Sequence, residues 1–197
     1  MMTDTPAPPA APKEFSDAAL GAMDDVYRFA RSLTKDAADA EDVVQDTYLR
    51  AFRSWRTFQP GTDIKRWLFT IARNAFLRSR EKGHREVTLD DDASAVVEAN
   101  RAQEAWVRGG LDPILDQADV GPAITAAIAG LPEAFRSVVT LVDVEDQPYE
   151  AAADVLGIPV GTVRSRLFRG RKLLQERLAQ HARDAGLAPS RPARSPA

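Results

Sequence analysis

The C-terminal third of the chain most constrains its fold, because two short amphipathic segments flank a tight turn at residues 157–159. The turn reads Gly-Ile-Pro, in which the glycine suits a left-handed helix end and the length sets two helices at a steep angle. The second segment, residues 160–178, places Val163, Leu167 and Leu174 on one face. This pattern is typical of a helix-turn-helix, whose second helix lies in the major groove of DNA.

The remaining faces of this second segment carry arginines and short hydroxyl side chains. Arginine engages a guanine edge with two hydrogen bonds, and hydroxyls bind phosphates or base edges. A surface hairpin with one basic side is the alternative. The residues predicted to contact DNA are Thr162, Arg164, Ser165, Arg166, Arg169 and Lys172.

Charge is unevenly distributed, although the formal net charge is only −3. Residues 65–85 carry seven Lys or Arg and one acid, and residues 164–183 carry seven and one acid. The segment between them, residues 86–119, carries nine acids and two arginines. Two separated cationic patches indicate a protein that contacts a polyanion at two places. Ordinary solvated helix faces are the alternative.

Apolar residues recur at helical spacing and strand-like alternation is absent, so the sequence predicts an all-α protein. Asp36 is the predicted cap of one helix, and Thr62 or Asp63 the cap of the next. The predicted helices span residues 16–33, the stretch from Asp36 to the break at 58–63, and residues 64–82, 123–129, 132–142, 148–156 and 160–178.

These helices predict two small helical domains joined by a flexible acidic linker. The first domain spans residues 15–83 and the second residues 122–182. The linker, residues 84–121, is acidic and includes a short predicted helix at 100–107. Residues 1–14 and 183–197, which are rich in proline and alanine, are predicted to be disordered tails.

Composition excludes several classes of site. Cysteine is absent, which rules out disulfides, thiolate zinc sites and a cysteine nucleophile. His84 and His181 lie far apart, so no catalytic set, metal site or cofactor is predicted. No apolar run approaches the ~18 residues of a membrane span, and the N-terminus lacks the apolar core of a secretory signal. The expected location is the cytoplasm.

Three stretches closely resemble the extracytoplasmic-function (ECF, group IV) sigma factors of bacterial RNA polymerase, in the sigma-70 family. They read AEDVVQDTYLRAF, FQPGTDIKRWLFTIARNAFLR and LPEAFRSVVTLVDVEDQPYEAAADVLGIPVGTVRSRLFRGRKLL. The resemblance covers about residues 20–180 in order and spacing. It implies two domains, region 2 and region 4, in a non-enzymatic subunit that recognises the minus-ten and minus-thirty-five promoter elements and promotes DNA opening to transcribe a stress or envelope regulon.

The resemblance also implies partners and residue roles. Core polymerase would bind through the flap and through its largest-subunit clamp helices, the latter docking on Asp42, Gln45 and Asp46. Promoter DNA and an anti-sigma factor, which can hold the chain at the membrane, are the other partners. Trp67 falls on the apolar stripe and is predicted as core. The residues implied in opening the minus-ten element are Phe58, Asp63, Lys65, Arg73, Asn74 and Arg78.

Two alternatives stay open at this point. A stand-alone helix-turn-helix regulator explains the C-terminal half but leaves residues 36–82 without a role. An enzyme acting on nucleic acid needs a metal or nucleophile cluster, and the sequence contains none.

Overall fold

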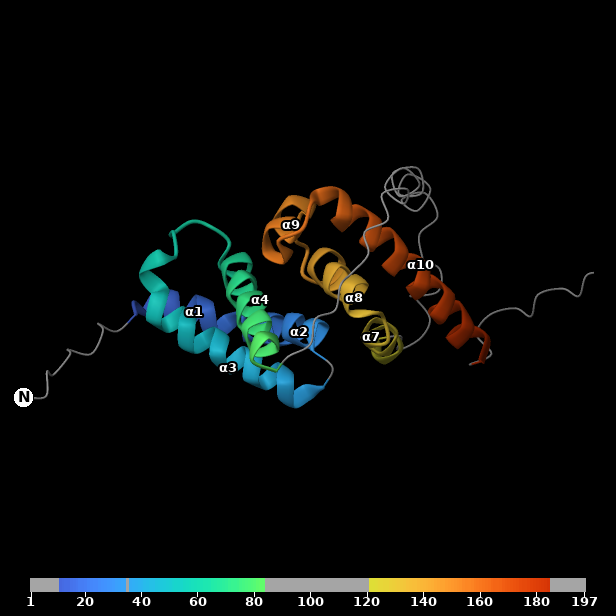
Figure 1. Cartoon of the computed structure of the whole chain (residues 1–197), viewed down its shortest axis with the longest axis horizontal. Coiled ribbons are helices and arrows are strands. Elements are labelled where there is room, and N and C mark those ends of the chain that lie inside the picture. Colours follow the sequence, from blue (N-terminus) through green and yellow to red (C-terminus); the bar gives the residue numbers. More distant parts are fainter. Residues whose placement is uncertain (1–10, 35, 84–120, 185–197) are drawn as a thin grey trace, which may run out of the picture. The chain divides into compact units, whose positions relative to one another are not determined.

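The computed structural model describes residues 11–34, 36–83 and 121–184, and all regular structure in them is helical (Figure 1). The all-α prediction is therefore confirmed. The predicted helix at 100–107 lies outside the described residues. None of the helices in these three ranges is long and apolar enough to cross a membrane.

The described residues form two compact units, and unit membership does not follow the order of the chain. Unit 1 combines the described residues before Asp90 with Thr140–Ile158, and unit 2 combines the others. The helices of unit 1 are α1 (Lys13–Gly21), α2 (Met23–Leu33), α3 (Ala37–Ser54), the 3-10 turn η1 (Trp55–Thr57), α4 (Ile64–Gly83), the π-helical turn η2 (Thr140–Val144) and α9 (Tyr149–Leu156). Those of unit 2 are α7 (Gly121–Ala129), α8 (Glu133–Val139) and α10 (Val160–Asp184).

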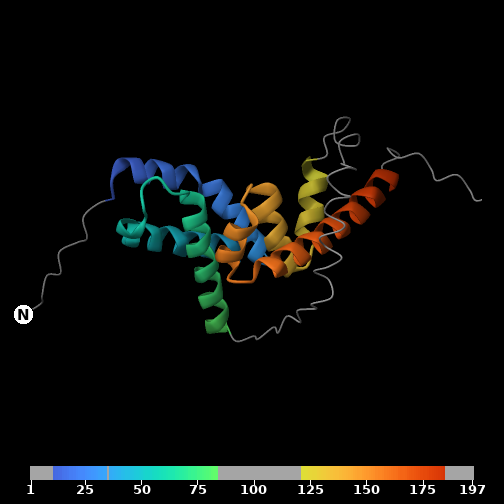
Figure 2. The ribbon, with the colours of Figure 1, turned by 90° about the horizontal axis from the view of Figure 1, so that it is seen from above.

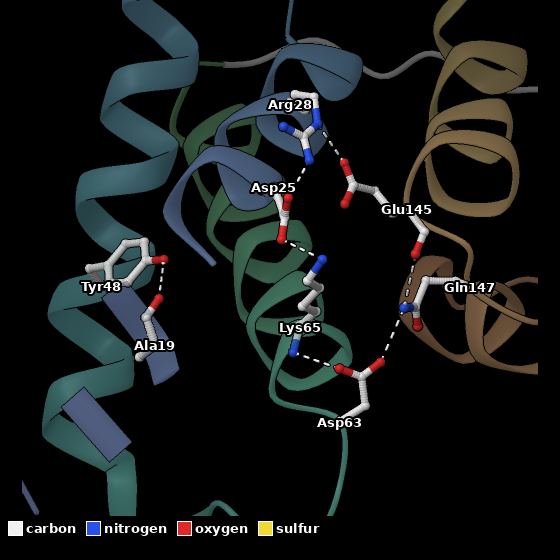
Figure 3. Close-up of polar contacts among 8 residues, drawn as sticks. All are labelled: Ala19, Asp25, Arg28, Tyr48, Asp63, Lys65, Glu145 and Gln147. Carbon is white, nitrogen blue, oxygen red and sulfur yellow. Dashed lines mark hydrogen bonds and ion pairs between the residues drawn. The ribbon is translucent and has the colours of Figure 1, made fainter. Parts of the chain in front are cut away.

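The predicted single helix over residues 16–33 is wrong, because the chain breaks between α1 and α2 at Ala22. The Ala19 carbonyl, which would accept the next helical hydrogen bond, instead accepts from the Ala22 N–H at 3.2 Å and from the Tyr48 hydroxyl at 2.7 Å (Figure 3). A long-range contact from α3 thus ends α1. This helix begins at Lys13, inside the predicted N-terminal tail.

The core of unit 1 lies between α2, α3 and α4, which cross one another (Figure 2). Phe29 and Phe69 are fully buried, with their rings 5.1 Å apart. Both predicted caps are present. Asp36 accepts from the Asp39 N–H at 2.9 Å and begins α3, and Asp63 accepts from the Lys65 N–H at 2.9 Å at the start of α4.

In unit 2, α10 packs against α8 and α7. Val163 and Leu167 of α10 are buried as predicted, whereas Leu174 is only half-buried. This helix continues to Asp184, beyond the predicted end at residue 178.

Two local backbone features lie near the points where the chain passes from unit 2 to unit 1 and back. The helix predicted over residues 132–142 is wrong in its last turn, because α8 ends at Val139 and widens into η2. There the Glu145 N–H bonds to the Thr140 carbonyl, five residues back, at 2.9 Å. At the other end Gly157 has φ 60° and ψ 41°, so the predicted left-handed end of α9 is confirmed.

The stability of unit 1 at alkaline pH depends on the protonation state of Tyr48. Burial first, and then the charges of Asp25 and Asp24, raise the pKa of Tyr48 to about 12, above the ~10 of an unfolded tyrosine. The neutral hydroxyl therefore stabilises the fold below about pH 10, and this stabilisation is lost as the pH rises through about 12. We expect urea unfolding of Tyr48→Phe to depend less on pH in that window. Tyr27→Phe is the control variant. If the free energy of unfolding changed equally with pH in both variants, Tyr48 would not be the group responsible.

Gly170 allows α10 to approach α8 closely. A Cβ at Gly170 would lie 2.7 Å from Cγ2 of the buried Val139, whereas a Cβ at Gly21 meets nothing within 4 Å. We expect Gly170→Ala to destabilise the protein by about 1–3 kcal/mol through overpacking, against the ordinary gain of alanine in a helix. Gly21→Ala should be neutral or stabilising. Equal urea midpoints for the two variants would show that the contact is unimportant.

Candidate nucleic-acid interface

A basic cleft of about 370 Å³ lies between α3 and α4 in unit 1. Asn74 and Arg78, both predicted to contact DNA, are exposed on its α4 side. Arg50 and Arg53 come from α3, and Arg50 is paired with Asp46 at 2.7 Å. Within the described part of the chain, Arg53 and Arg78 have no acidic partner. Free guanidinium groups beside an amide form a surface that suits a phosphate backbone and a base edge.

Arg50 and Arg53 were not among the residues predicted from the sequence to contact DNA. Their spacing of three residues on a predicted helix places both on the same side of α3, which is a signal that was available. What the sequence could not show is that this side of α3 faces the Asn74 side of α4.

The other residues predicted to open DNA are not free. Lys65 Nζ lies 2.6 Å from Asp25 Oδ2, and this contact raises the pKa of Lys65. Asp63 caps α4 with one carboxylate oxygen and accepts from Gln147 Nε2 with the other, at 3.1 Å. Arg73 is half-buried, and burial lowers its pKa. These side chains therefore already have partners or cover within unit 1.

Aromatic side chains surround the start of α4. Trp67, predicted as core, is only half-buried, and its ring packs 5.8 Å from Phe15 and 5.5 Å from Phe58. Phe58 also packs on Phe15 at 5.8 Å. The loop that bears Phe58 is thus anchored by ring contacts, while its role beside a DNA base stays a prediction.

The acidic residues of α3 lie beside a second cleft, of about 430 Å³, between α3 and α4. Asp42 and Gln45 are exposed, and Asp46 is half-buried and paired with Arg50. Asp42 and Asp46 line the cleft together with Arg78 of α4. An exposed carboxylate and amide here suit a basic protein surface.

The predicted groove-reading residues all lie in the first half of α10. Lys172 is exposed and four others are partly exposed: Thr162, Arg164, Arg166 and Arg169. Ser165 differs, because it is only 9% exposed and its hydroxyl donates to the Thr162 carbonyl at 3.1 Å. Its hydroxyl is therefore already engaged within the helix.

A ring of polar contacts in unit 1 was not predicted from the sequence (Figure 3). Glu145 and Gln147, from the turn after η2, contact Arg28 of α2 and Asp63 at the start of α4. The sequence shows an acidic turn at residues 143–146, but nothing in it indicates a partner more than a hundred residues earlier.

Comparison with known proteins identifies the modules. The Sigma-70 region 2 family model matches residues 22–86, and the Sigma-70 region 4 model matches residues 122–174. Two similar proteins are the ECF RNA polymerase sigma factors SigE of Mycolicibacterium smegmatis, 38% identical over 81% of this chain and 59% of that protein, and SigM of Bacillus subtilis, 33% identical over 78% and 88%. The chain thus spans less than two thirds of the length of SigE.

Solved structures agree with this relationship. The sigma factor RpoE of Bartonella quintana, solved in complex with the anti-sigma factor NepR, superposes with a TM-score of 0.59 at 29% identity, covering 85% of this chain and 98% of that one. CnrH, solved with the cytosolic domain of CnrY, shares the fold at a TM-score of 0.52. The family models fall on the two predicted modules in the predicted order, and the chain belongs to the ECF RNA polymerase sigma factors of the sigma-70 family.

Proposed function

We propose that this chain is a dissociable initiation subunit that binds core RNA polymerase, recognises two promoter elements and opens the DNA. The observation that carries this proposal is the basic cleft of α3 and α4, where Asn74, Arg53 and Arg78 are exposed together. The basic first half of α10 is a second nucleic-acid surface in the same chain. A subunit that must hold duplex DNA at one element and a separated strand at another needs two such surfaces.

Asn74 reads a base of the minus-ten element. Its carboxamide offers a donor and an acceptor to the edge of a base that has left the stack. Arg53 and Arg78, on the same cleft, hold the phosphates on either side. Unstacking costs a few kcal/mol per base step, and these contacts to the displaced strand offset it.

The α10 helix reads the minus-thirty-five element in the major groove. Arg164, Arg166 and Arg169 supply the guanidinium groups, and Thr162 lies in the first turn, where recognition helices meet base edges. Lys172 is exposed farther along the helix and binds a phosphate.

The acidic face of α3 docks on the polymerase. Asp42, Gln45 and Asp46 contact the clamp helices of the largest subunit, and region 4 contacts the flap. An anti-sigma factor is the proposed inhibitory partner, since a relative was solved in complex with one. The site of action is the cytoplasm, and a membrane-bound anti-sigma factor would hold the chain there at the membrane.

Run-off transcription tests the proposed function directly. We expect core polymerase with this protein to initiate at specific sites in a library of genomic promoter fragments, while core enzyme alone does not. If core enzyme alone gave the same transcripts as core enzyme with this protein, the proposal would be contradicted. Tight binding of the isolated protein to a palindromic duplex would instead support a stand-alone regulator.

Asn74→Ala and Arg164→Ala should separate opening from upstream recognition. Asn74→Ala removes the base-reading amide from an exposed site, so we expect retained promoter binding and reduced opening, measured by permanganate reactivity of unpaired thymines. Arg164→Ala should weaken the free energy of binding to the upstream element by about 1–3 kcal/mol. In the complexes that still form, the unpaired region of the DNA should be unchanged. Loss of upstream binding in Asn74→Ala would contradict the assignment.

A further inference from the structure

The two clefts between α3 and α4 share two of the side chains that line them. Arg50 of α3 and Arg78 of α4 line both clefts. Asp42 and Asp46 line only the larger cleft, of about 430 Å³, and Asn74 lines only the basic cleft, of about 370 Å³. The two shared arginines therefore lie where the proposed polymerase-docking surface meets the proposed DNA-opening surface.

Arg50 has a partner on the acidic side of this boundary. Its Nε lies 2.7 Å from Oδ2 of Asp46, four residues earlier on α3. An acid that precedes a base by four residues is the favourable order for an ion pair on a helix. Both side chains remain accessible to solvent, since Asp46 is 39% and Arg50 40% exposed. The ion pair is therefore formed, but other charged groups can reach both of its members.

Arg53 provides a comparison within the same helix. It lies three residues after Arg50, is exposed and lines the basic cleft alone. Among the ion pairs of the described residues, none involves Arg53. Two arginines of α3 thus line one cleft, and a carboxylate of the proposed docking surface holds one of them.

We propose that Arg50 exchanges between two partners: the Asp46 carboxylate in the free protein, and a phosphate of the separated promoter strand when polymerase has engaged Asp46. This inference rests on the proposed function, because it needs both the docking surface and the DNA-opening surface. A basic group of the polymerase that pairs with Asp46 replaces Arg50 there. The guanidinium is then available to a phosphate in the basic cleft.

The strength of the ion pair suits such an exchange. An exposed pair at this spacing on a helix changes an equilibrium by only about twofold. A phosphate accepts hydrogen bonds from the guanidinium fork as a carboxylate does, so the strand restores the contact that Arg50 gives up. Breaking a buried pair costs far more. The exposure of both Asp46 and Arg50 is therefore what allows either one to change partners.

The exchange links the two binding events. Polymerase bound at Asp46 favours strand binding at Arg50, and a strand bound at Arg50 makes Asp46 available to polymerase by the same factor. The strength of the pair limits this factor to about twofold. The pair therefore favours joint occupation of the two surfaces and blocks neither of them.

Binding of single-stranded DNA by the free full-length protein tests the DNA side of the exchange. Asp46→Asn releases Arg50, so we expect about twofold tighter binding of a fluorescent random-sequence oligonucleotide. In an Arg50→Gln background the same change should have little effect, because the group that it releases is absent. Asp42→Asn is the control for the lost charge, since it removes a carboxylate of the same cleft and leaves the pair in place.

Two results of this experiment would overturn the exchange. An equal gain from Asp46→Asn in both backgrounds would mean that Asp46 acts only through its general charge. Equal affinities of Asp46→Asn and Asp42→Asn would mean that release of Arg50 adds nothing to DNA binding.

Binding to core polymerase in the absence of DNA tests the other side. Arg50→Gln releases Asp46, so we expect about twofold tighter binding to core polymerase than for Arg53→Gln. Both changes remove one positive charge from α3 at the basic cleft, but only Arg50 is paired with Asp46. Equal affinities of the two variants, or tighter binding of Arg53→Gln, would overturn the exchange.

The outcome for the wild-type protein separates the two proposals. If it does not bind core polymerase, the proposed function is overturned, and the exchange with it, because no partner then engages Asp46. If it binds core polymerase and supports promoter-specific transcription, but either comparison of variants gives equal affinities, the exchange alone is overturned.

Discussion

The polar contacts of unit 1 depend on the buried carboxylate of Glu145. A buried charge needs an opposite charge or hydrogen bonds to offset the loss of water, and here the guanidinium of Arg28 lies 2.8 Å from the carboxylate. Arg28 then orients Asp25, which holds Lys65 beside Asp63. Polar contacts thus lead from one buried acid just after η2 to side chains of α2 and α4.

Local backbone features make this arrangement possible. The π-helical turn η2 follows α8 after Val139, and the Glu145 N–H at its end bonds to the Thr140 carbonyl. At the far end of α9, left-handed Gly157 stops the helix and leaves room for the guanidinium of Arg73.

Most of the fold could be predicted, because helix formation leaves local marks. Capping by Asp36 and Asp63, the left-handed Gly157 and the apolar stripe of α10 all follow from the chemistry of neighbouring residues. The first helix was predicted wrongly because a distant residue intervenes, whereas the error after Val139 lies in the local backbone. The Tyr48 hydroxyl takes the Ala19 carbonyl and splits the first helix, and α8 widens beyond Val139.

The same distinction between local features and long-range contacts holds for the candidate site. The sequence by itself determined the residue types, with arginines and an asparagine at helical spacing, and their likeness to a sigma factor. Only the tertiary structure decided that Arg53 shares a cleft with Asn74, that Lys65 pairs with Asp25, and that Arg73 lies against Gly157. The reason is physical: helical periodicity is set over a few residues, whereas contacts between residues far apart in the chain depend on how the helices pack.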